Sequence, residues 1–230
     1  MTIQRAVLLV GSAKPAGTST SEALGDYLLR RLEDRGVGPT VLRVSGAPTA
    51  RVERRLAAAL ADADLFVLAA PVYVDSLPHL VTRAFESVAR STSDRRTSCA
   101  FTAIVNCGFP EAEQCRTALD IAQAFARRAG FVWAGGLALG EGGTIDGKPL
   151  AGVGGLARHV RRALDLAAGA LAVGAPVPAA AIEQMAQPMM PPRLYTAIGN
   201  FGWRLRAGRN RVLSTLDARP FAGEATESRR

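Results

Sequence analysis

The chain is poor in the residues that hold structural metals and disulfides. Its 230 residues include three cysteines and two histidines. Cys99, Cys107 and Cys115 are an odd number at spacings of eight, so no pair has the CxxC spacing of zinc and redox motifs. A disulfide framework is not indicated, and a zinc or iron–sulfur site needs more clustered ligands. We therefore predict a reduced, cytoplasmic protein without a structural metal.

Long uninterrupted apolar runs are missing as well. The N-terminus, "MTIQRAVLLVGS", has no charged region ahead of a long apolar segment, so no secretory signal is predicted. The most apolar later window, "ALDLAAGALAVGAPVPAAA", contains Asp165 and is broken by Pro176 and Pro178. We interpret it as a helix followed by a linker rather than as a membrane span.

Lysine is scarce, and the positive charge is concentrated near the C-terminus. Only Lys14 and Lys148 among the 28 basic residues are lysines, and the net charge is +8. From Arg193 onward, eight arginines stand against three acidic residues, a balance of +5 that leaves +3 for the rest. This pattern fits either a solvated helix face or contact with an anionic partner. No nucleic-acid partner is predicted, because the body of the chain has no known reader motif.

Short apolar runs alternate with helical patterns over residues 1–174. Leu24, Leu28 and Leu32, spaced by four, give a helix at 18–35 one apolar face. Strands alternating with helices form a parallel sheet with helices on both faces, so we predict an α/β domain whose ligand site lies beyond the carboxyl ends of the strands. The predicted strands are 5–10, 39–44, 64–71, 98–108 and 131–140, and the predicted helices are 18–35, 50–63, 77–90, 111–130 and 156–172.

Residues 175–230 read as an extension of this domain. Residues 175–192 contain five prolines and are predicted to be a linker. Residues 193–216 regain a helical period, with one apolar stripe and arginines among the other positions, which predicts an amphipathic helix. The last dozen residues are predicted to be disordered. The stripe consists of Leu194, Ile198, Phe201 and Leu205.

The loop at 11–20 has the composition of an anion site. Hydroxyl residues from Thr18 to Ser21 open the following helix, whose N-terminus offers unpaired N–H groups and the positive end of the helix dipole. Lys14 adds a charge. A Walker loop for ATP has a lysine where this chain has Thr18, and a dinucleotide-binding loop has its second glycine where this chain has Ala13. Neither motif is therefore present. We predict a phosphate site here, with simple helix capping by the hydroxyls as the alternative.

Two further loops follow predicted strands. "APVYVDSLPHL" at 70–80 puts Tyr73 two residues after a strand end, where its ring would lie at the edge of the sheet. In "VNCGFPE" at 105–111, the glycine lets the backbone approach a flat ligand closely. Cys107 in this loop is either a redox thiol or a small buried hydrophobic side chain.

Together the three loops resemble those of the flavodoxin-like NAD(P)H-dependent FMN reductase family. The first family loop usually reads close to GSPRxxGSNT, and residues 11–20 read "GSAKPAGTST", with Lys14 for the usual arginine and Ser19 for the usual asparagine. The second typically reads P-x-Y-x-x-x-x-P, and residues 71–78 read "PVYVDSLP". The resemblance runs from about residue 3 to residue 140 and implies a flavodoxin-like fold that binds FMN. It implies phosphate contacts from Ser12, Lys14, Thr18, Ser19 and Thr20, and ring contacts from Pro71, Val72, Tyr73, Val74, Asp75, Asn106, Cys107, Gly108 and Phe109.

The activity that the resemblance implies is an FMN-dependent NAD(P)H oxidoreductase. NADPH or NADH would reduce the flavin, which would pass electrons to a quinone, a free flavin or another small acceptor. Backbone amides of residues 106–109 would stabilise the reduced ring. No catalytic side chain is assigned, since His79 either donates a proton or only packs at its helix start. A homodimer is expected, because one subunit of this fold leaves the ring partly exposed.

Other functions remain open. A flavodoxin-type electron carrier would bind the same cofactor, but such carriers use acidic faces, which +8 does not fit. An accessory protein that has lost its cofactor would fit the departures at Ala13 and Ser19. The helix at 193–216 would suit an anionic membrane surface, with Trp203 and the arginines at the interface, or would pack on the body or on a second subunit.

Overall fold

A computed structural model describes residues 2–45, 49–91 and 98–219. The chain divides into two compact units, and the boundary follows Met189. The first unit holds the sheet and the helices that cover it, and the second holds one long helix and a short turn.

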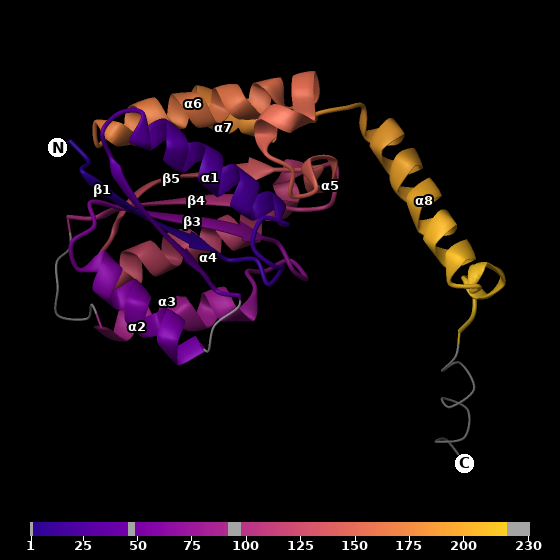
Figure 1. The fold of residues 1–230 in the computed structure, drawn as a ribbon, viewed down its shortest axis with the longest axis horizontal. Coiled ribbons are helices and arrows are strands. Elements are labelled where there is room, and N and C mark those ends of the chain that lie inside the picture. The colour runs from indigo at the N-terminus through magenta and orange to yellow at the C-terminus, as the bar shows by residue number, and fades with distance from the viewer. Residues whose placement is uncertain (1, 46–48, 92–97, 220–230) are drawn as a thin grey trace, which may run out of the picture. The chain divides into compact units, whose positions relative to one another are not determined.

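The first unit is built on a parallel sheet (Figure 1). Its strands lie in the order β2-β1-β3-β4-β5, so the chain changes direction across the sheet between β1 and β3, which is the switch point where such folds bind ligands. All five predicted strands are confirmed, and their ends differ from the prediction by at most two residues. The strands are β1 (Arg5–Val10), β2 (Gly38–Arg43), β3 (Leu65–Pro71), β4 (Ala100–Asn106) and β5 (Val132–Leu139).

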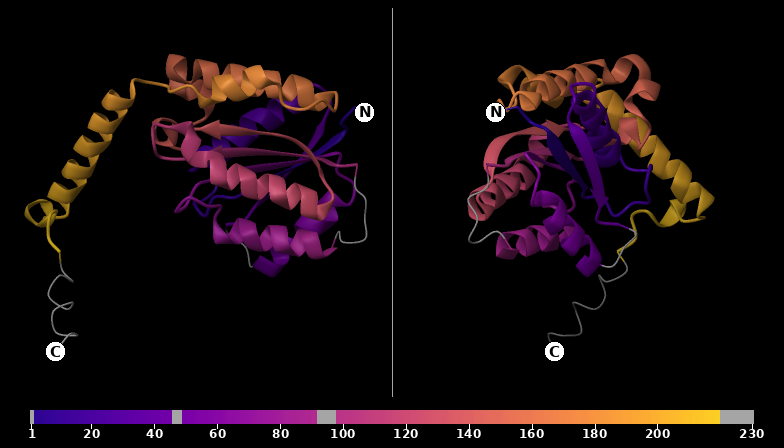
Figure 2. Two further views of the ribbon diagram at one scale, coloured as in Figure 1. Left: turned by 180° about the vertical axis from the view of Figure 1, so that it is seen from behind. Right: turned by 60° about the vertical axis from the view of Figure 1, so that its left-hand side comes forward.

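Helices cover both faces of the sheet (Figures 1 and 2). One face carries α1 (Thr20–Glu33), α6 (Arg158–Ala172) and α7 (Ala179–Ala186), and the other carries α2 (Thr49–Leu60), α3 (His79–Ser91) and α4 (Arg116–Ala129). Short helices lie in the loops after β4 and β5, namely η1 (Ala112–Cys115), α5 (Gly142–Ile145) and η2 (Leu150–Ala157). The flavodoxin-like α/β architecture expected from the sequence is therefore present.

A separate hydrophobic core lies on each side of the sheet. Leu24, Leu28 and Leu32 of α1 are buried against the first face, as their spacing predicts. The second core contains a group of phenylalanines, in which the rings of Phe85 and Phe125 stack with centroids 3.7 Å apart. The central strand β3 is buried on both faces from its first residue to its sixth, which explains its continuous apolar sequence.

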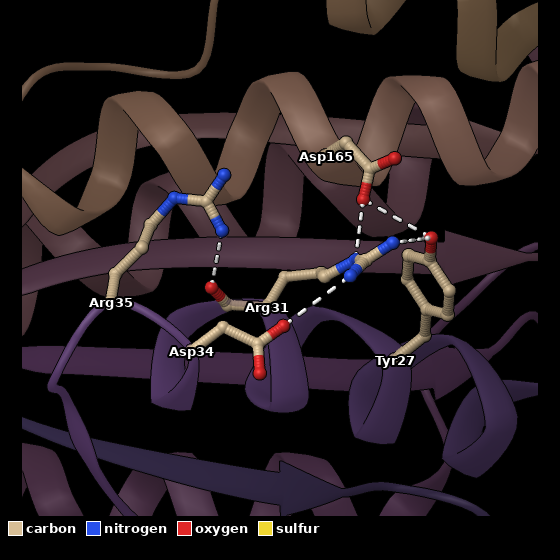
Figure 3. Close-up of polar contacts among 5 residues, drawn as sticks. All are labelled: Tyr27, Arg31, Asp34, Arg35 and Asp165. Carbon is tan, nitrogen blue, oxygen red and sulfur yellow. Dashed lines mark hydrogen bonds and ion pairs between the residues drawn. The ribbon is translucent and has the colours of Figure 1, made fainter.

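A polar cluster links α1 to α6 at the edge of the first core (Figure 3). The Nε of Arg31 donates to a carboxylate oxygen of Asp165 at 2.7 Å, and the Tyr27 hydroxyl donates to the same oxygen at 3.1 Å. The hydrogen bond with Tyr27, together with the negative charge of Asp165, raises the pKa of Arg31. The Asp165 that breaks the apolar window of the sequence therefore connects two helices of one layer.

The segment predicted as a linker, 175–192, contains the helix α7. Pro178 precedes the first turn, where a missing N–H costs no intrahelical hydrogen bond, so the proline favours a helix start at this point. Ala181 and Met185 are buried in the first core, and Val177 donates its N–H to the Ala134 carbonyl of β5 at 2.7 Å. The prolines that suggested a linker thus mark the start of a helix that packs on the sheet.

The second unit consists of α8 (Pro192–Arg209) and the turn η3 (Leu213–Thr215). The predicted helix is present, but its apolar stripe is exposed, with Ile198 at 56% and Phe201 at 70%. No helix in the described ranges is long and apolar enough to cross a membrane. Of the segment predicted to be disordered, residues 220–230 lie outside the described residues.

Candidate functional site

The carboxyl ends of β1, β3, β4 and β5 converge on one polar cavity of 190 Å³. It lies at the switch point between β1 and β3, where parallel α/β sheets bind ligands. A larger open hollow of 830 Å³ lies along α8 and η3, but a single helix and its following turn form it, without loops that converge from several elements. The polar cavity is lined by Ser12, Lys14, Ser19, Thr20, Ser21, Pro71, Val72, Tyr73, Asn106, Cys107, Gly108, Gly142, Gly143 and Asp146.

The start of α1 forms one wall of the cavity. Ser19 is the N-cap, and its hydroxyl oxygen accepts the N–H of Glu22 at 3.1 Å. The amides of Thr20 and Ser21 belong to the first turn, which has no intrahelical acceptor. Gly11 allows the loop to pass close to the side chain of Val81 as it leaves β1, because a Cβ at position 11 would lie 2.5 Å from a methyl carbon of Val81. This wall has the donors and the dipole of an anion site.

Glu22 places a carboxylate inside the same loop. Its side chain is 5% exposed, and one oxygen accepts the Gly17 N–H at 2.6 Å while the other accepts the Nε of Arg43 at 2.6 Å. Burial, assisted by the charge of Glu22, raises the pKa of Asp26 one turn further along α1. The loop thus already binds one carboxylate of the chain itself, that of Glu22. The prediction omitted Glu22, although "STSE" at 19–22 has the spacing of a capping box.

The hydroxyl groups of the first turn tie α1 to the neighbouring loops. Thr20 donates to the Gly142 carbonyl at 2.8 Å, and Ser21 donates to the side-chain oxygen of Asn106 at 2.7 Å. Ser12 differs, because its hydroxyl oxygen accepts the Lys14 N–H at 3.2 Å and keeps its hydrogen for a ligand. Ser12, Lys14 and the first-turn amides are therefore the groups best placed to bind an anion.

The loop after β3 is a tight turn with backbone strain. Tyr73 and Ser76 exchange two backbone hydrogen bonds of 2.9 and 3.2 Å around Val74 and Asp75, which have φ values of 49° and 57°. Two left-handed residues define the turn type that favours Asn-Gly, and a β-branched residue there costs about 1–3 kcal/mol. The turn keeps the ring of Tyr73 at the cavity and leaves Val74 98% exposed beside it.

Backbone hydrogen bonds connect the loop after β4 to the end of β3 on one side and to the end of β5 on the other. The Asn106 carbonyl accepts the Val72 N–H at 2.8 Å, which fixes the loop to the end of β3. The Cys107 amide donates to the Leu139 carbonyl at 3.0 Å, and its carbonyl accepts the Gly142 N–H at 2.9 Å. The expectation that amides of 106–109 bind a reduced ring is therefore wrong for Cys107, whose N–H is directed at β5.

The segment after β5 forms a further part of the cavity wall. Gly142, Gly143 and Asp146 line it, and Gly147 packs so closely that a Cβ there would lie 2.5 Å from the Thr18 carbonyl oxygen. Gly147 also has a φ of 74°, which an L side chain rarely adopts. The prediction named no residue of this segment, although it follows the last strand and is rich in glycine.

The structure brings most of the predicted residues to the cavity. Ten of them line it: Ser12, Lys14, Ser19, Thr20, Pro71, Val72, Tyr73, Asn106, Cys107 and Gly108. Thr18, Val74, Asp75 and Phe109 do not, and the Thr18 hydroxyl donates to the Pro15 carbonyl at 2.7 Å. His79 is exposed at the start of α3 and is not part of the lining. Within the described residues no cluster of His, Cys, Asp and Glu has the arrangement of a metal site.

Comparison with known proteins supports the fold. No protein-family model matches the chain, and no curated sequence does. An FMN-dependent NADH-azoreductase from Bacillus anthracis str. Ames Ancestor, solved with FMN, is 10% identical with a TM-score of 0.56, over 74% of this chain and 100% of that one. A protein described as a quinone reductase from Klebsiella pneumoniae is 16% identical with a TM-score of 0.53, over 76% of this chain and 87% of that one. At these identities the likeness shows a flavodoxin-like fold.

Proposed function

We propose that this protein is an FMN-dependent NAD(P)H oxidoreductase. The observation that carries the proposal is the cavity at the switch point, where the first turn of α1 and the loops after β3 and β4 meet. The names of the two solved relatives, an FMN-dependent azoreductase and a quinone reductase, support the same kind of activity.

The residues present fit the phosphate end of FMN. Ser12, Lys14 and the first-turn amides of α1 supply donors and positive charge around 190 Å³ of space. Pockets for whole ligands of drug size measure about 300–1,000 Å³, so the cavity would take the phosphate and part of the ribityl chain. The ring would then lie against the exposed side of Tyr73, which is 44% exposed. When bound, FMN supplies the two-electron chemistry between NAD(P)H and an acceptor.

We propose further that the active form is a homodimer. Ligand sites normally bury most of their ligand, whereas Tyr73, Val74 and Phe109 lie exposed beside or next to residues that line the cavity. A second copy would cover these apolar side chains together with the ring. Light scattering of the purified protein at several concentrations tests this, and a monomer with and without FMN would contradict it.

A cofactor-free accessory role is the second candidate, and Glu22 favours it. This carboxylate already takes the Gly17 amide, and the hydroxyls of Thr20 and Ser21 donate within the chain. An internal anion at the loop does part of what a bound phosphate would do. Arg43, which pairs with Glu22, offsets that charge. Lys14 forms no ion pair within the described residues, and it shares the lining of the cavity with Asp146.

The test is a titration of the purified full chain with FMN, followed by oxygen-free addition of NADPH or NADH. Binding followed by rapid bleaching of the flavin band supports the oxidoreductase. Binding without bleaching supports the electron carrier, and a chain that does not bind FMN supports the accessory role. Lys14→Ala should weaken FMN binding about tenfold through the lost charged hydrogen bond. Lys148→Ala is the matched control, because Lys148 is also exposed but does not line the cavity.

We also propose that α8 contacts an anionic membrane surface. The supporting observation is that Phe201 and Trp203 are 70% and 68% exposed on a helix that also carries Arg204, Arg206 and Arg209. Aromatic and arginine side chains on one exposed helix suit the interface of an anionic bilayer. Such a contact would bring the protein close to lipid-soluble quinones.

A further inference from the structure

A second pocket, separate from the polar cavity, lies where β2 ends. It has a volume of 270 Å³, and its polar side chains are Arg43 and Ser45 at the end of β2 and Arg51 and Arg55 of α2. None of the described residues that line it is acidic. We call it the arginine pocket. Guanidinium groups that converge on one hollow from two elements are the donors that bind phosphate groups best.

The arginine pocket lies at the same edge of the sheet as the polar cavity. β2 pairs with β1 in parallel, Arg43 lies opposite Val10, and the Val44 N–H donates to the Val10 carbonyl at 3.1 Å. The pocket therefore begins one strand away from the point where the loop at 11–20 leaves β1. Arg43 also connects the two sites, because its Nε donates to Glu22 of α1 at 2.6 Å.

The positive charge of the arginine pocket exceeds what the chain itself offsets. Glu22 pairs with Arg43, whereas Arg51 and Arg55 are exposed and form no ion pair within the described residues. These two arginines lie one turn apart on α2, where like charges repel each other. Arg51 also lies in the first turn of α2, at the positive end of the helix dipole, and that turn contains no acidic residue. The arrangement is unfavourable by itself and becomes favourable when an anion with two negative charges binds.

We propose that the arginine pocket binds the 2′-phosphate of NADPH, so that the protein uses NADPH in preference to NADH. The proposal rests on the proposed oxidoreductase function, whose hydride donor it names. The 2′-phosphate is a monoester with close to two negative charges at pH 7, and NADH lacks it. It belongs to the adenosine half of NADPH, away from the nicotinamide ring that reacts, so a pocket beside the polar cavity suits it. In dinucleotide-binding folds of another class, an arginine binds the same phosphate.

Titration calorimetry of the full chain without FMN tests the proposal with adenosine 2′,5′-bisphosphate and 5′-AMP. The two nucleotides differ only in the 2′-phosphate. The bisphosphate should bind at least about tenfold more tightly, which is the contribution expected from one charged hydrogen bond. Inorganic phosphate, titrated in the same way, should bind more weakly than the bisphosphate. The comparison uses the wild type, so it does not depend on whether a variant folds.

The variant R51Q/R55Q should lose the preference for the bisphosphate. The matched control is R158Q/R162Q, which removes two exposed arginines with the same spacing at the start of α6, away from the lining of the arginine pocket. This control should keep the preference. In the full chain loaded with FMN, R51Q/R55Q should raise the KM for NADPH about tenfold and leave the KM for NADH unchanged. Its affinity for FMN should equal that of the wild type, unlike that of K14A.

Four outcomes would overturn the proposal. The bisphosphate and 5′-AMP would bind equally well, or the preference would persist in R51Q/R55Q. Inorganic phosphate would bind as tightly as the bisphosphate, which would make the pocket a site for free phosphate. R51Q/R55Q would weaken FMN binding as K14A does, which would assign the arginines to the phosphate of the cofactor. Failure of the proposed function is a separate result, because a chain that prefers the bisphosphate but does not oxidise NADPH would keep the phosphate site and lose the redox activity.

Discussion

The helices α1 and α8 have similar apolar periods in sequence and opposite outcomes in structure. In α1, Leu24 and Leu28 are fully buried, because the sheet lies against that face. In α8, Leu194 is 51% exposed and Ile198 is 56% exposed. The period tells which residues share a face, whereas burial depends on whether another element covers that face. The comparison separates a sheet-bearing unit with two cores from a C-terminal unit whose apolar side chains lie open to solvent.

The strongest test of this difference between α1 and α8 is to replace one leucine of the apolar face of each helix by alanine. Leu24→Ala should lower the free energy of unfolding by about 2–5 kcal/mol, since it removes a buried side chain from a packed core. Leu194→Ala should change it by no more than about 0.5 kcal/mol. Urea unfolding followed by circular dichroism measures both. A large loss from Leu194→Ala would mean that the stripe of α8 is covered in solution.

Two ion pairs allow the same comparison between a buried and an exposed side chain for charged residues. Glu22→Ala should destabilise the protein by about 2 kcal/mol, because Glu22 is buried, although partial exposure of Arg43 reduces the effect. Asp62→Ala is the control: Asp62 and Arg5 are 75% and 62% exposed, and the pair is separated by 3.9 Å. Removal of that pair should be close to neutral. Equal effects in urea unfolding would contradict the buried role of Glu22.

The thiols of the first unit should show a pH-dependent difference. A thiolate absorbs in the ultraviolet, so titration of the native protein should show a rise centred near pH 7 from Cys107 and none from Cys99 below about pH 12. The rise should persist in C99S and vanish in C107S. Because the folded pKa of Cys107 lies below its unfolded value, its ionisation stabilises the fold above the unfolded pKa, and this contribution is lost as the pH falls through 7. A native titration centred near pH 9 would contradict this.

The last prediction concerns membrane binding through the surface charge of α8, where each arginine is expected to contribute little by itself. Replacement of Arg204, Arg206 and Arg209 by glutamine should reduce flotation of the full chain with vesicles of phosphatidylserine and phosphatidylcholine, at about 1 kcal/mol for each arginine near the surface. The matched control replaces three exposed arginines of α2 in the first unit, Arg51, Arg54 and Arg55, by glutamine. Equal flotation of the two variants would end the proposal that α8 contacts the membrane.

The fold was more predictable than the site. The strands were found because β3 and its neighbours are short continuous apolar runs, a pattern that parallel sheets impose on each strand by burying both faces. The helix α7 was missed, because Pro176 and Pro178 mark helix starts and linkers alike. What separates the two possibilities is the hydrogen bond from Val177 to β5, a contact between residues 43 positions apart.

The site was predicted where a loop carries its own signal. The hydroxyls after Gly11 and the aromatic residue after β3 pointed to the edge of the sheet where the cavity lies, and Ser12, Lys14 and Tyr73 line that cavity. The hydrogen-bond partners of individual side chains in the site could not be predicted from the sequence. Thr20 and Ser21 donate to Gly142 and Asn106, which are 122 and 85 residues away, and no local pattern contains that information.

The amino-acid order alone determined the alternation of strands and helices, the hydroxyl-rich composition of the first loop and the apolar faces of α1 and α8. These depend on periods of two and of 3.6 residues and on the chemistry of neighbouring side chains, which are local properties. Tertiary structure alone decided that Glu22 pairs with Arg43 of β2, that Thr20 and Ser21 donate to Gly142 and Asn106, and that one apolar face is covered while the other is exposed. Those outcomes depend on which distant elements meet, and packing decides that only once the whole sheet has formed.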